Sequence, residues 1–202
     1  MDFGALSQQI IARVTPSKRL IVAIAGPPGS GKSTIAEGVV AALGPTAVIM
    51  PMDGYHMDNA VLDARGLRPR KGAPQTFDVA AFARDLARVR ADNCEVLVPV
   101  FDRALDLSRA SARVLGPEAR IIVIEGNYLL LDQAPWKDLV EHYDFTVFLE
   151  VSDAELERRL IQRWRDHDHD QAAAEARARG NDLPNARFVN DHRQPADVVL
   201  RN

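Results

Sequence analysis

The stretch RLIVAIAGPPGSGKS, residues 19–33, determines the fold. Its apolar first half is typical of a buried strand, and apolar residues recur at helical spacing from Ile35 to Leu43. Between them, GPPGSGKS (26–33) matches the phosphate-loop pattern G-x-x-x-x-G-K-[ST] in the strand–loop–helix context that this motif requires. The stretch therefore predicts a site for a nucleoside triphosphate.

The loop residues suit this chemistry. The glycines allow consecutive backbone N–H groups to turn toward phosphates, and the following helix directs its positive end at the same anion. We expect Lys32 to reach the β- and γ-phosphates and the Ser33 hydroxyl to bind Mg²⁺. A glycine-rich turn without a ligand would explain neither residue. The predicted ATP-binding residues are Gly26, Pro27, Pro28, Gly29, Ser30, Gly31, Lys32, Ser33 and Thr34.

The rest of the chain continues an alternation of strands and helices. Further strands are predicted at 47–50, 95–100, 120–124, 145–151 and 196–200. Helices are predicted at 2–14, after Asp78, and after the capping box that begins at Ser152. This order predicts one α/β domain over residues 1–202, a three-layer P-loop NTPase with a doubly wound, mostly parallel sheet.

Composition narrows the class of partner. Lys and Arg number 25 and Asp and Glu 28, so no polybasic field favours nucleic acid, and we expect a small-molecule partner. No apolar run approaches the length of a membrane span and no signal peptide is evident, which predicts a cytoplasmic protein without a membrane partner. The single cysteine, Cys94, leads into an apolar stretch and is expected to be buried. Oligomeric state stays open, a homodimer included.

The region 165–185 is polar and rich in Ala, without an evident apolar stripe, and it predicts a mobile lid over about 163–186. Four arginines precede or enter it: Arg158, Arg159, Arg163 and Arg165. Arg159 and Arg163 share a helix face and could stabilise a transferring phosphoryl group. The alternative is a solvated helix surface on which Glu155 pairs with Arg159.

Carboxylates follow three of the predicted strands. Asp53 comes just after the second, where it could orient and deprotonate an acceptor hydroxyl, although it could also simply form a turn before Gly54. Glu125 ends the run IIVIE and could support a metal ion, the alternative being a cap or turn. Asp102 ends the third strand in the same manner. His56, in the polar loop after Asp53, is equally compatible with a functional and a solvated role.

Taken in order, these residues resemble the superfamily of uridine kinase, phosphoribulokinase and bacterial pantothenate kinase, in particular its fructose-transport-associated, uridine-kinase-like branch. Besides the phosphate loop, the resemblance rests on MDGYHMDN (52–59), RKGAPQTFDV (70–79), PVFDRALD (99–106), IEGNYLLL (124–131) and NDLPNA (181–186). It implies that Asp53 activates the acceptor, that Glu125 is the Walker-B-like acid and that Ser33 is the magnesium hydroxyl. It also implies an acceptor site of Tyr55, His56, Arg70, Lys71, Phe77, Asp102, Arg103, Asn127 and Tyr128.

The predicted function is therefore an ATP- and Mg²⁺-dependent phosphotransferase that phosphorylates a hydroxyl of a small metabolite, with Asp53, Lys32, Arg159 and Arg163 as catalytic residues. Three kinds of acceptor stay open: pantothenate, a nucleoside, and a sugar such as fructose. The segment 70–79 and the Ala-rich lid depart from the nucleoside kinases, and the chain is shorter than typical pantothenate kinases. The alternative is an NTP-binding regulatory module with little turnover, which would need an exposed apolar docking patch.

Overall fold

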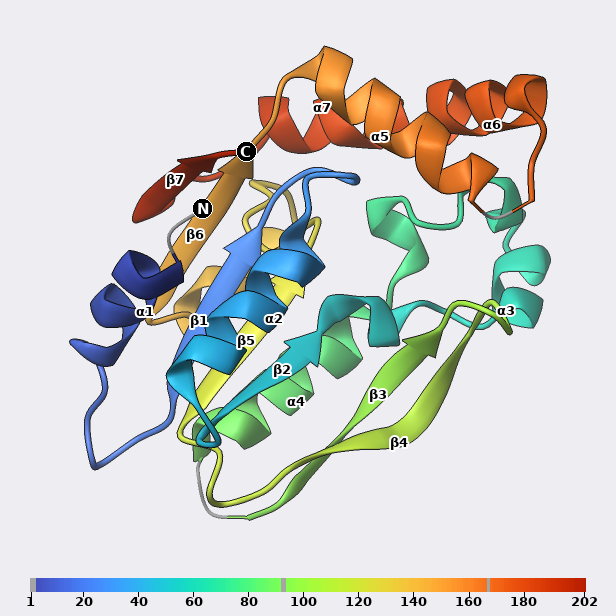
Figure 1. The fold of residues 1–202 in the computed structure, drawn as a ribbon. Helices are drawn as coiled ribbons and strands as arrows, with labels where there is room; N and C mark the ends of the chain where they lie inside the picture. The colour runs from blue at the N-terminus through green and yellow to red at the C-terminus, as the bar shows by residue number, and fades with distance from the viewer. Residues whose placement is uncertain (1–2, 92–93, 167) are drawn as a thin grey trace.

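The computed structural model describes residues 3–91, 94–166 and 168–202 (Figure 1). Its centre is a five-stranded parallel sheet with the order β2-β5-β1-β6-β7. These strands are β1 (Leu20–Ala25), β2 (Ala47–Pro51), β5 (Ile121–Gly126), β6 (Phe145–Glu150) and β7 (Val198–Arg201). Every residue of β1 is buried, because helices cover both faces of the sheet. The predicted α/β fold with a parallel sheet is confirmed.

Two apolar clusters hold the three layers together. On one face, α1 (Phe3–Ile11) and α2 (Lys32–Leu43) pack Ile10 and Val39 against Val22. On the other face of the sheet, α4 (Val79–Ala91) and the 3₁₀ helix η4 (Trp136–His142) pack against β1 and β5. The first helix ends at Ile11, before the predicted end at residue 14, and residue 2 of the predicted range lies outside the described residues.

The third predicted strand does not join the sheet. β3 (Val96–Asp102) pairs antiparallel with β4 (Leu107–Leu115) in a separate two-stranded sheet. The connection between them is too short for a parallel crossover, and most residues of β4, LSRASARVL, are exposed or half-buried. The prediction for 95–100 was therefore right about a strand and wrong about its sheet. Cys94, at the start of this half-exposed hairpin, is exposed rather than buried.

Short helices connect β2 to α4, which precedes the hairpin. They are η1 (Met52–Tyr55), α3 (Asn59–Ala64), η2 (Arg68–Arg70) and η3 (Pro74–Thr76). Figure 1 shows that this segment leaves the end of β2 and that α3 lies beside the turn of the β3–β4 hairpin. The acceptor motifs predicted at 52–59 and 70–79 therefore lie on connections rather than on the sheet itself.

The polar C-terminal segment folds into helices. α5 (Asp153–Arg165) begins at the predicted cap, where the Ser152 hydroxyl accepts from the Glu155 N–H at 3.4 Å. It is followed by α6 (Gln171–Arg177), the π-helical η5 (Ala178–Asp182) and α7 (Leu183–Asp191), grouped together in Figure 1.

The expected absence of an apolar stripe in this segment was wrong. Ala174 and Ala178 are buried, and Ala178 and Leu183 pack in one cluster with Leu156 and Leu160 of α5. The stripe is made mostly of alanine, which hides it in a hydropathy pattern. The mobility of this lid stays a prediction, as does the division of the chain into one domain. Within the described residues, no helix combines the length and hydrophobicity of a membrane span.

Candidate active site

The phosphate loop lies at the carboxyl end of β1 and closes into α2. Gly29 and Gly31 adopt φ angles of 81° and 89°, the left-handed region that favours glycine. Lys32 is buried, and its ammonium donates to the Pro27 carbonyl at 2.9 Å and approaches the Ser30 hydroxyl at 3.5 Å. Burial lowers the pKa of Lys32 to about 8, against the opposing charges of Glu125 and Asp53. The Pro27 carbonyl thus fixes the Lys32 ammonium within the loop.

Two carboxylates reach this loop from the neighbouring strands β2 and β5. Pro51 lies in register with Glu125, and Asp53 follows in η1, so parallel pairing brings both to the same edge of the sheet. Glu125 is only 8% exposed. Burial and the negative charge of Asp53 raise the pKa of Glu125, while Lys32 and a hydrogen bond from Ser33 oppose this shift.

Asp53 is held on two sides. The Arg103 guanidinium donates to its carboxylate at 3.0 Å, from the turn between β3 and β4. Because a carbonyl oxygen only accepts, the 2.8 Å contact between His56 Nδ1 and the Asp53 carbonyl requires the proton on Nδ1. The His56 ring lies between Phe77 and Phe101, at centroid distances of 4.0 and 4.6 Å, and burial lowers its pKa. A neutral imidazole therefore sits beside Asp53.

One cleft of about 1140 Å³ joins these groups. Its walls come from the phosphate loop, the η1–η3 connections, the turn of the hairpin, the end of β5 and helices α5 to α7. Predicted residues that line it are Pro28, Gly29, Gly31, Lys32, Ser33, Thr34, Asp53, His56, Lys71, Phe77, Arg103, Glu125, Asn127, Arg159 and Arg163. The phosphate loop and much of the predicted acceptor site thus share one space.

Four residues assigned to the acceptor by resemblance lie elsewhere. Tyr55 is buried in the core, where its hydroxyl donates to Asp85 at 2.8 Å. Tyr128 is buried and donates to the Gly72 carbonyl, so it supports the wall without lining it. Asp102 does not line the cleft, and its carboxylate accepts from the Leu105 N–H at 3.1 Å. Arg70 lines a second cavity beside the cleft.

The arginines of α5 divide into two groups. Arg159 is 2.7 Å from Glu155, and its Nη1 approaches the Gly29 and Ser30 carbonyls of the phosphate loop at 3.5 and 3.4 Å. Arg163 lies on the same face and lines the cleft. Arg158 also pairs with Glu155 but is 66% exposed, and neither it nor Arg165 lines the cleft.

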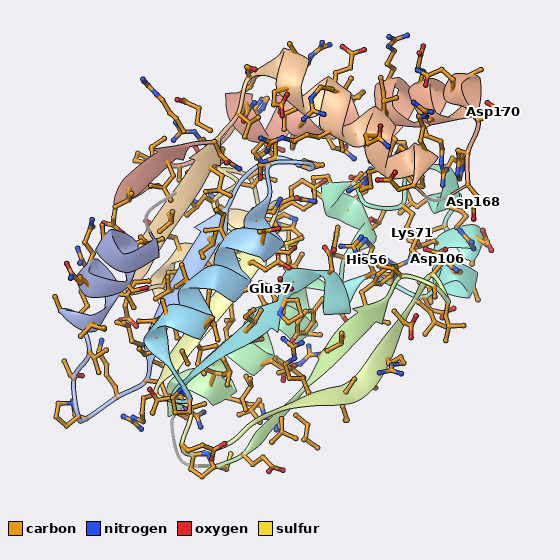
Figure 2. All side chains as sticks on the ribbon, in the orientation of Figure 1. Glu37, His56, Lys71, Asp106, Asp168 and Asp170 are labelled. Atoms are coloured by element: carbon orange, nitrogen blue, oxygen red, sulfur yellow. The ribbon has the colours of Figure 1, made fainter. Side chains whose placement is uncertain are left out.

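Two aspartates that the sequence reasoning did not single out also line the cleft. Asp182 is buried and accepts from Arg163 at 3.1 Å and from the Trp164 indole N–H at 2.6 Å. Asp106 binds the Lys71 ammonium at 2.8 Å (Figure 2 shows the two beside each other at the hairpin turn). Both aspartates belong to motifs already quoted, NDLPNA and PVFDRALD, and that was the available signal.

The donor set fits Mg²⁺ held largely by nucleotide phosphates. In the part of the chain that the structure describes, no three His, Cys, Asp or Glu side chains cluster as a metal cage. Mg²⁺ commonly binds through one or two protein oxygens together with substrate phosphates and waters. The Ser33 hydroxyl and the buried Glu125 carboxylate are such oxygens, beside the phosphate loop.

Comparison with known proteins gives consistent matches. The model of the Phosphoribulokinase / Uridine kinase family matches residues 21–202. A crystal structure described as a "putative fructose transport system kinase" from Silicibacter sp. TM1040 superposes with a TM-score of 0.95, at 48% identity over 99% of both chains. A "putative uridine kinase" of Schizosaccharomyces pombe is 32% identical over 99% of this chain and 90% of its own length.

Other relatives are longer than the matched region. The uncharacterized protein YggC of Escherichia coli (strain K12) is 38% identical over 74% of this chain, and the match spans 64% of YggC. The pantothenate kinase of Streptomyces coelicolor is 30% identical over 72% of this chain, and the match spans 47% of that enzyme. Each alignment leaves part of the relative without a counterpart in this chain.

Proposed function

The chain belongs to the Phosphoribulokinase / Uridine kinase family, and on that premise we propose that it transfers the γ-phosphoryl group of ATP to a hydroxyl of a small metabolite. The observation that carries the proposal is the single cleft in which Asp53 faces the same space as the phosphate loop and Glu125. A carboxylate on the acceptor side of a phosphate loop is the arrangement that phosphoryl transfer to an alcohol needs.

The nucleotide side binds and orients ATP. Backbone N–H groups of the loop and the N-terminal end of α2 receive the phosphates, and Lys32 exchanges its bond to the Pro27 carbonyl for phosphate oxygens. Ser33 and Glu125 hold Mg²⁺, which when bound offsets negative charge on the β- and γ-phosphates. The desolvated position of Lys32 strengthens its attraction to these anions.

Asp53 acts on the acceptor. Its carboxylate accepts the proton of the acceptor hydroxyl as that oxygen bonds to the γ-phosphorus. The bond from the γ-phosphorus to the bridging oxygen of ADP breaks, and ADP leaves with the electron pair. Arg103 holds one carboxylate oxygen at 3.0 Å, which fixes the orientation of the base. The neutral His56 leaves Nε2 as a hydrogen-bond acceptor for a second polar group of the substrate.

Helices α5 to α7 supply the remaining wall. Arg159 and Arg163 face the cleft, where they stabilise charge on the transferring phosphoryl group as the segment closes and excludes water. Asp182 restrains Arg163. On this proposal the acceptor is pantothenate, a nucleoside or a sugar such as fructose. Each of these offers a primary hydroxyl to Asp53.

The test is the release of ADP from ATP and Mg²⁺ by the purified protein, with and without each candidate acceptor. We expect one compound to raise the rate well above basal hydrolysis and to appear as its phosphate ester by mass spectrometry. Lys32→Met should abolish this stimulation. ADP release that no member of the panel raises, together with intact ATP binding, would favour an NTP-binding regulatory module instead.

A further inference from the structure

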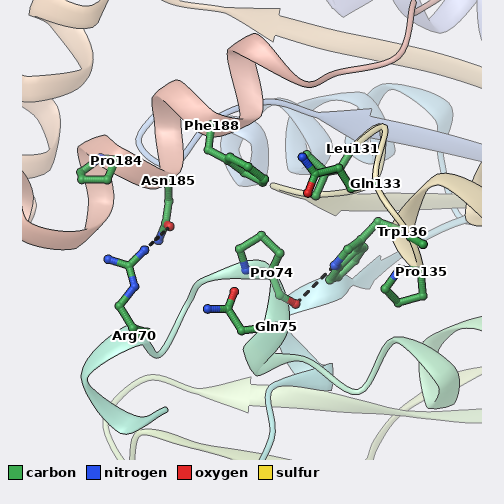
Figure 3. Close-up of a pocket in the computed structure, with 11 residues that line it drawn as sticks. Arg70, Pro74, Gln75, Leu131, Gln133, Pro135, Trp136, Pro184, Asn185 and Phe188 are labelled. Atoms are coloured by element: carbon green, nitrogen blue, oxygen red, sulfur yellow. Dashed lines mark hydrogen bonds between the residues drawn. The ribbon is translucent and has the colours of Figure 1, made fainter. Parts of the chain in front are cut away.

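A second cavity of about 330 Å³ lies beside the cleft, between η2–η3, the connection before η4, and α7 (Figure 3). It is lined by Arg70, Pro74, Gln75, Leu131, Gln133, Ala134, Pro135, Trp136, Pro184, Asn185 and Phe188. Asn185 also lines the main cleft, so the two spaces meet at this residue. A volume of this size is at the lower end of the range for small-molecule sites.

Arg70 and Asn185 bring hydrogen-bond donors to the cavity. Arg70 donates to the Asn185 side-chain oxygen at 3.3 Å, and within the described residues it has no carboxylate partner. Because a guanidinium only donates, the amide atom that faces Arg70 is the oxygen, which leaves Asn185 Nδ2 as a further donor. Asn185 is only 4% exposed, and no acceptor for Nδ2 is found in the described part of the chain.

The other walls are apolar. Trp136 is buried and held in place by its indole N–H, which donates to the Pro74 carbonyl at 3.3 Å. Phe188 of α7 lies opposite, and Pro135 and Pro184 extend the apolar surface on either side (Figure 3). Rigid aromatic and proline side chains form a preformed surface that loses little entropy when a ligand binds.

We propose that this cavity binds the carboxylate end of a small organic acid, with Arg70 and Asn185 holding the carboxylate and Trp136 and Phe188 packing its apolar part. The Arg70 guanidinium, which has no carboxylate partner within the described residues, and the Asn185 amide N–H₂ can both donate to one planar anion. The acid is either the far end of the phosphoryl acceptor, reaching past Asn185, or a separate effector. The first source rests on the proposed function, and the second does not.

Tryptophan fluorescence can report on the cavity, because the chain has two tryptophans and only Trp136 lines it. In Trp164→Phe protein, Trp136 emission is followed during titration with hexanoate, pantothenate, inorganic phosphate and the uncharged hexanamide. We expect both carboxylates to bind at least tenfold more tightly than hexanamide. Calorimetric titration of the unmodified chain with the same compounds guards against an effect of Trp164→Phe on folding.

Two variants test the assigned donors. Arg70→Gln should weaken carboxylate binding about 10- to 150-fold, the range for a hydrogen bond to a charged group, and Asn185→Leu should weaken it as well. Lys137→Gln removes a cation from the exposed side of η4, next to Trp136 but outside the cavity, and should change nothing. Equal binding of hexanoate and hexanamide, no carboxylate binding, loss of binding in Lys137→Gln alone, or tighter binding of phosphate would overturn the proposal.

Kinetics then separate the two sources. If hexanoate competes with the acceptor that is turned over fastest, and Arg70→Gln raises the KM of that acceptor with little change in kcat, the cavity holds the acceptor's far end. If hexanoate binds without competing, the cavity is an effector site. Binding that depends on Arg70 while no acceptor is phosphorylated would contradict the proposed function but leave the cavity assignment intact.

Discussion

The two walls of the cleft are built in different ways. The phosphate wall comes from one contiguous segment, 26–34, between β1 and the first turn of α2. The opposite wall is assembled from segments 53–77, 101–106 and 163–185, which meet only after folding. A contiguous wall depends on local backbone geometry, whereas an assembled wall depends on how distant elements pack. The comparison suggests that substitutions act directly on the first wall and through neighbouring elements on the second.

Within the assembled wall, Asp53→Asn should give the largest effect, because it removes the base without disturbing the contiguous wall. We expect kcat to fall about 10²- to 10⁴-fold, the usual contribution of general-base catalysis, with ATP affinity nearly unchanged. Steady-state kinetics and nucleotide titration measure the two quantities separately.

The matched control is Asp102→Asn. Asp102 follows the third strand as Asp53 follows the second, but the structure places it off the cleft, on the Leu105 N–H. Its activity should stay within a few-fold of the unmodified chain. Comparable losses in both variants would contradict the role of Asp53 as a base and indicate a general sensitivity of this wall.

The sequence predicted the phosphate wall more completely than the opposite wall, for physical reasons. The phosphate loop has fixed spacing and special backbone angles at Gly29 and Gly31, so a local pattern identified it. Asp53 and Glu125 were placed because parallel strands end at one edge of the sheet. Asp102 was misplaced because successive residues of an extended segment point to opposite sides, and it is Phe101 and Arg103 on either side of it that line the cleft. Asp182 depends on packing between α5 and α7, which no local pattern records.

Gly54→Ala tests how the assembled wall is supported. An added Cβ would lie 2.3 Å from the Pro99 carbonyl oxygen, where η1 packs on β3. We expect a loss of about 1–3 kcal/mol in the free energy of unfolding, since the backbone must shift to relieve the overlap. Urea unfolding measures it, and kcat should fall as well because Asp53 is the preceding residue.

Gly180→Ala is the corresponding control in α6–α7. An added Cβ there meets nothing within 4 Å, so stability should be unchanged or rise by up to about 1 kcal/mol from the higher helix propensity of alanine. Equal stability of the Gly54→Ala and Gly180→Ala proteins would show that the contact between η1 and the hairpin does not constrain the wall.

Lys32 makes the contiguous wall sensitive to pH. Its pKa is lowered to about 8, mainly by burial, so the nucleotide-free protein loses this positive charge as pH rises through 8. Phosphates favour the ammonium, so ATP binding should take up about half a proton at pH 8 and close to one proton at about pH 9, and affinity should fall by up to about tenfold per pH unit above 8. Calorimetry in buffers of different ionisation enthalpy measures the uptake. If proton uptake on ATP binding is unchanged in the Lys32→Met protein, the proton is bound by a group other than Lys32.

The smallest expected effect is the difference in ATP affinity between variants of Arg159 and Arg158. Both arginines contact the same Glu155 carboxylate. Arg159 also approaches the Gly29 and Ser30 carbonyls, which helps hold the loop with its N–H groups toward the phosphates, whereas Arg158 lies in solvent. Arg159→Gln should weaken ATP binding by about 1 kcal/mol, roughly fivefold, and Arg158→Gln by less than twofold. Each variant removes one partner of Glu155, so the loss of that ion pair is matched. Equal losses would mean that the charge of the α5 surface, rather than contact with the loop, determines the effect, and the two walls would then be less independent than their construction suggests.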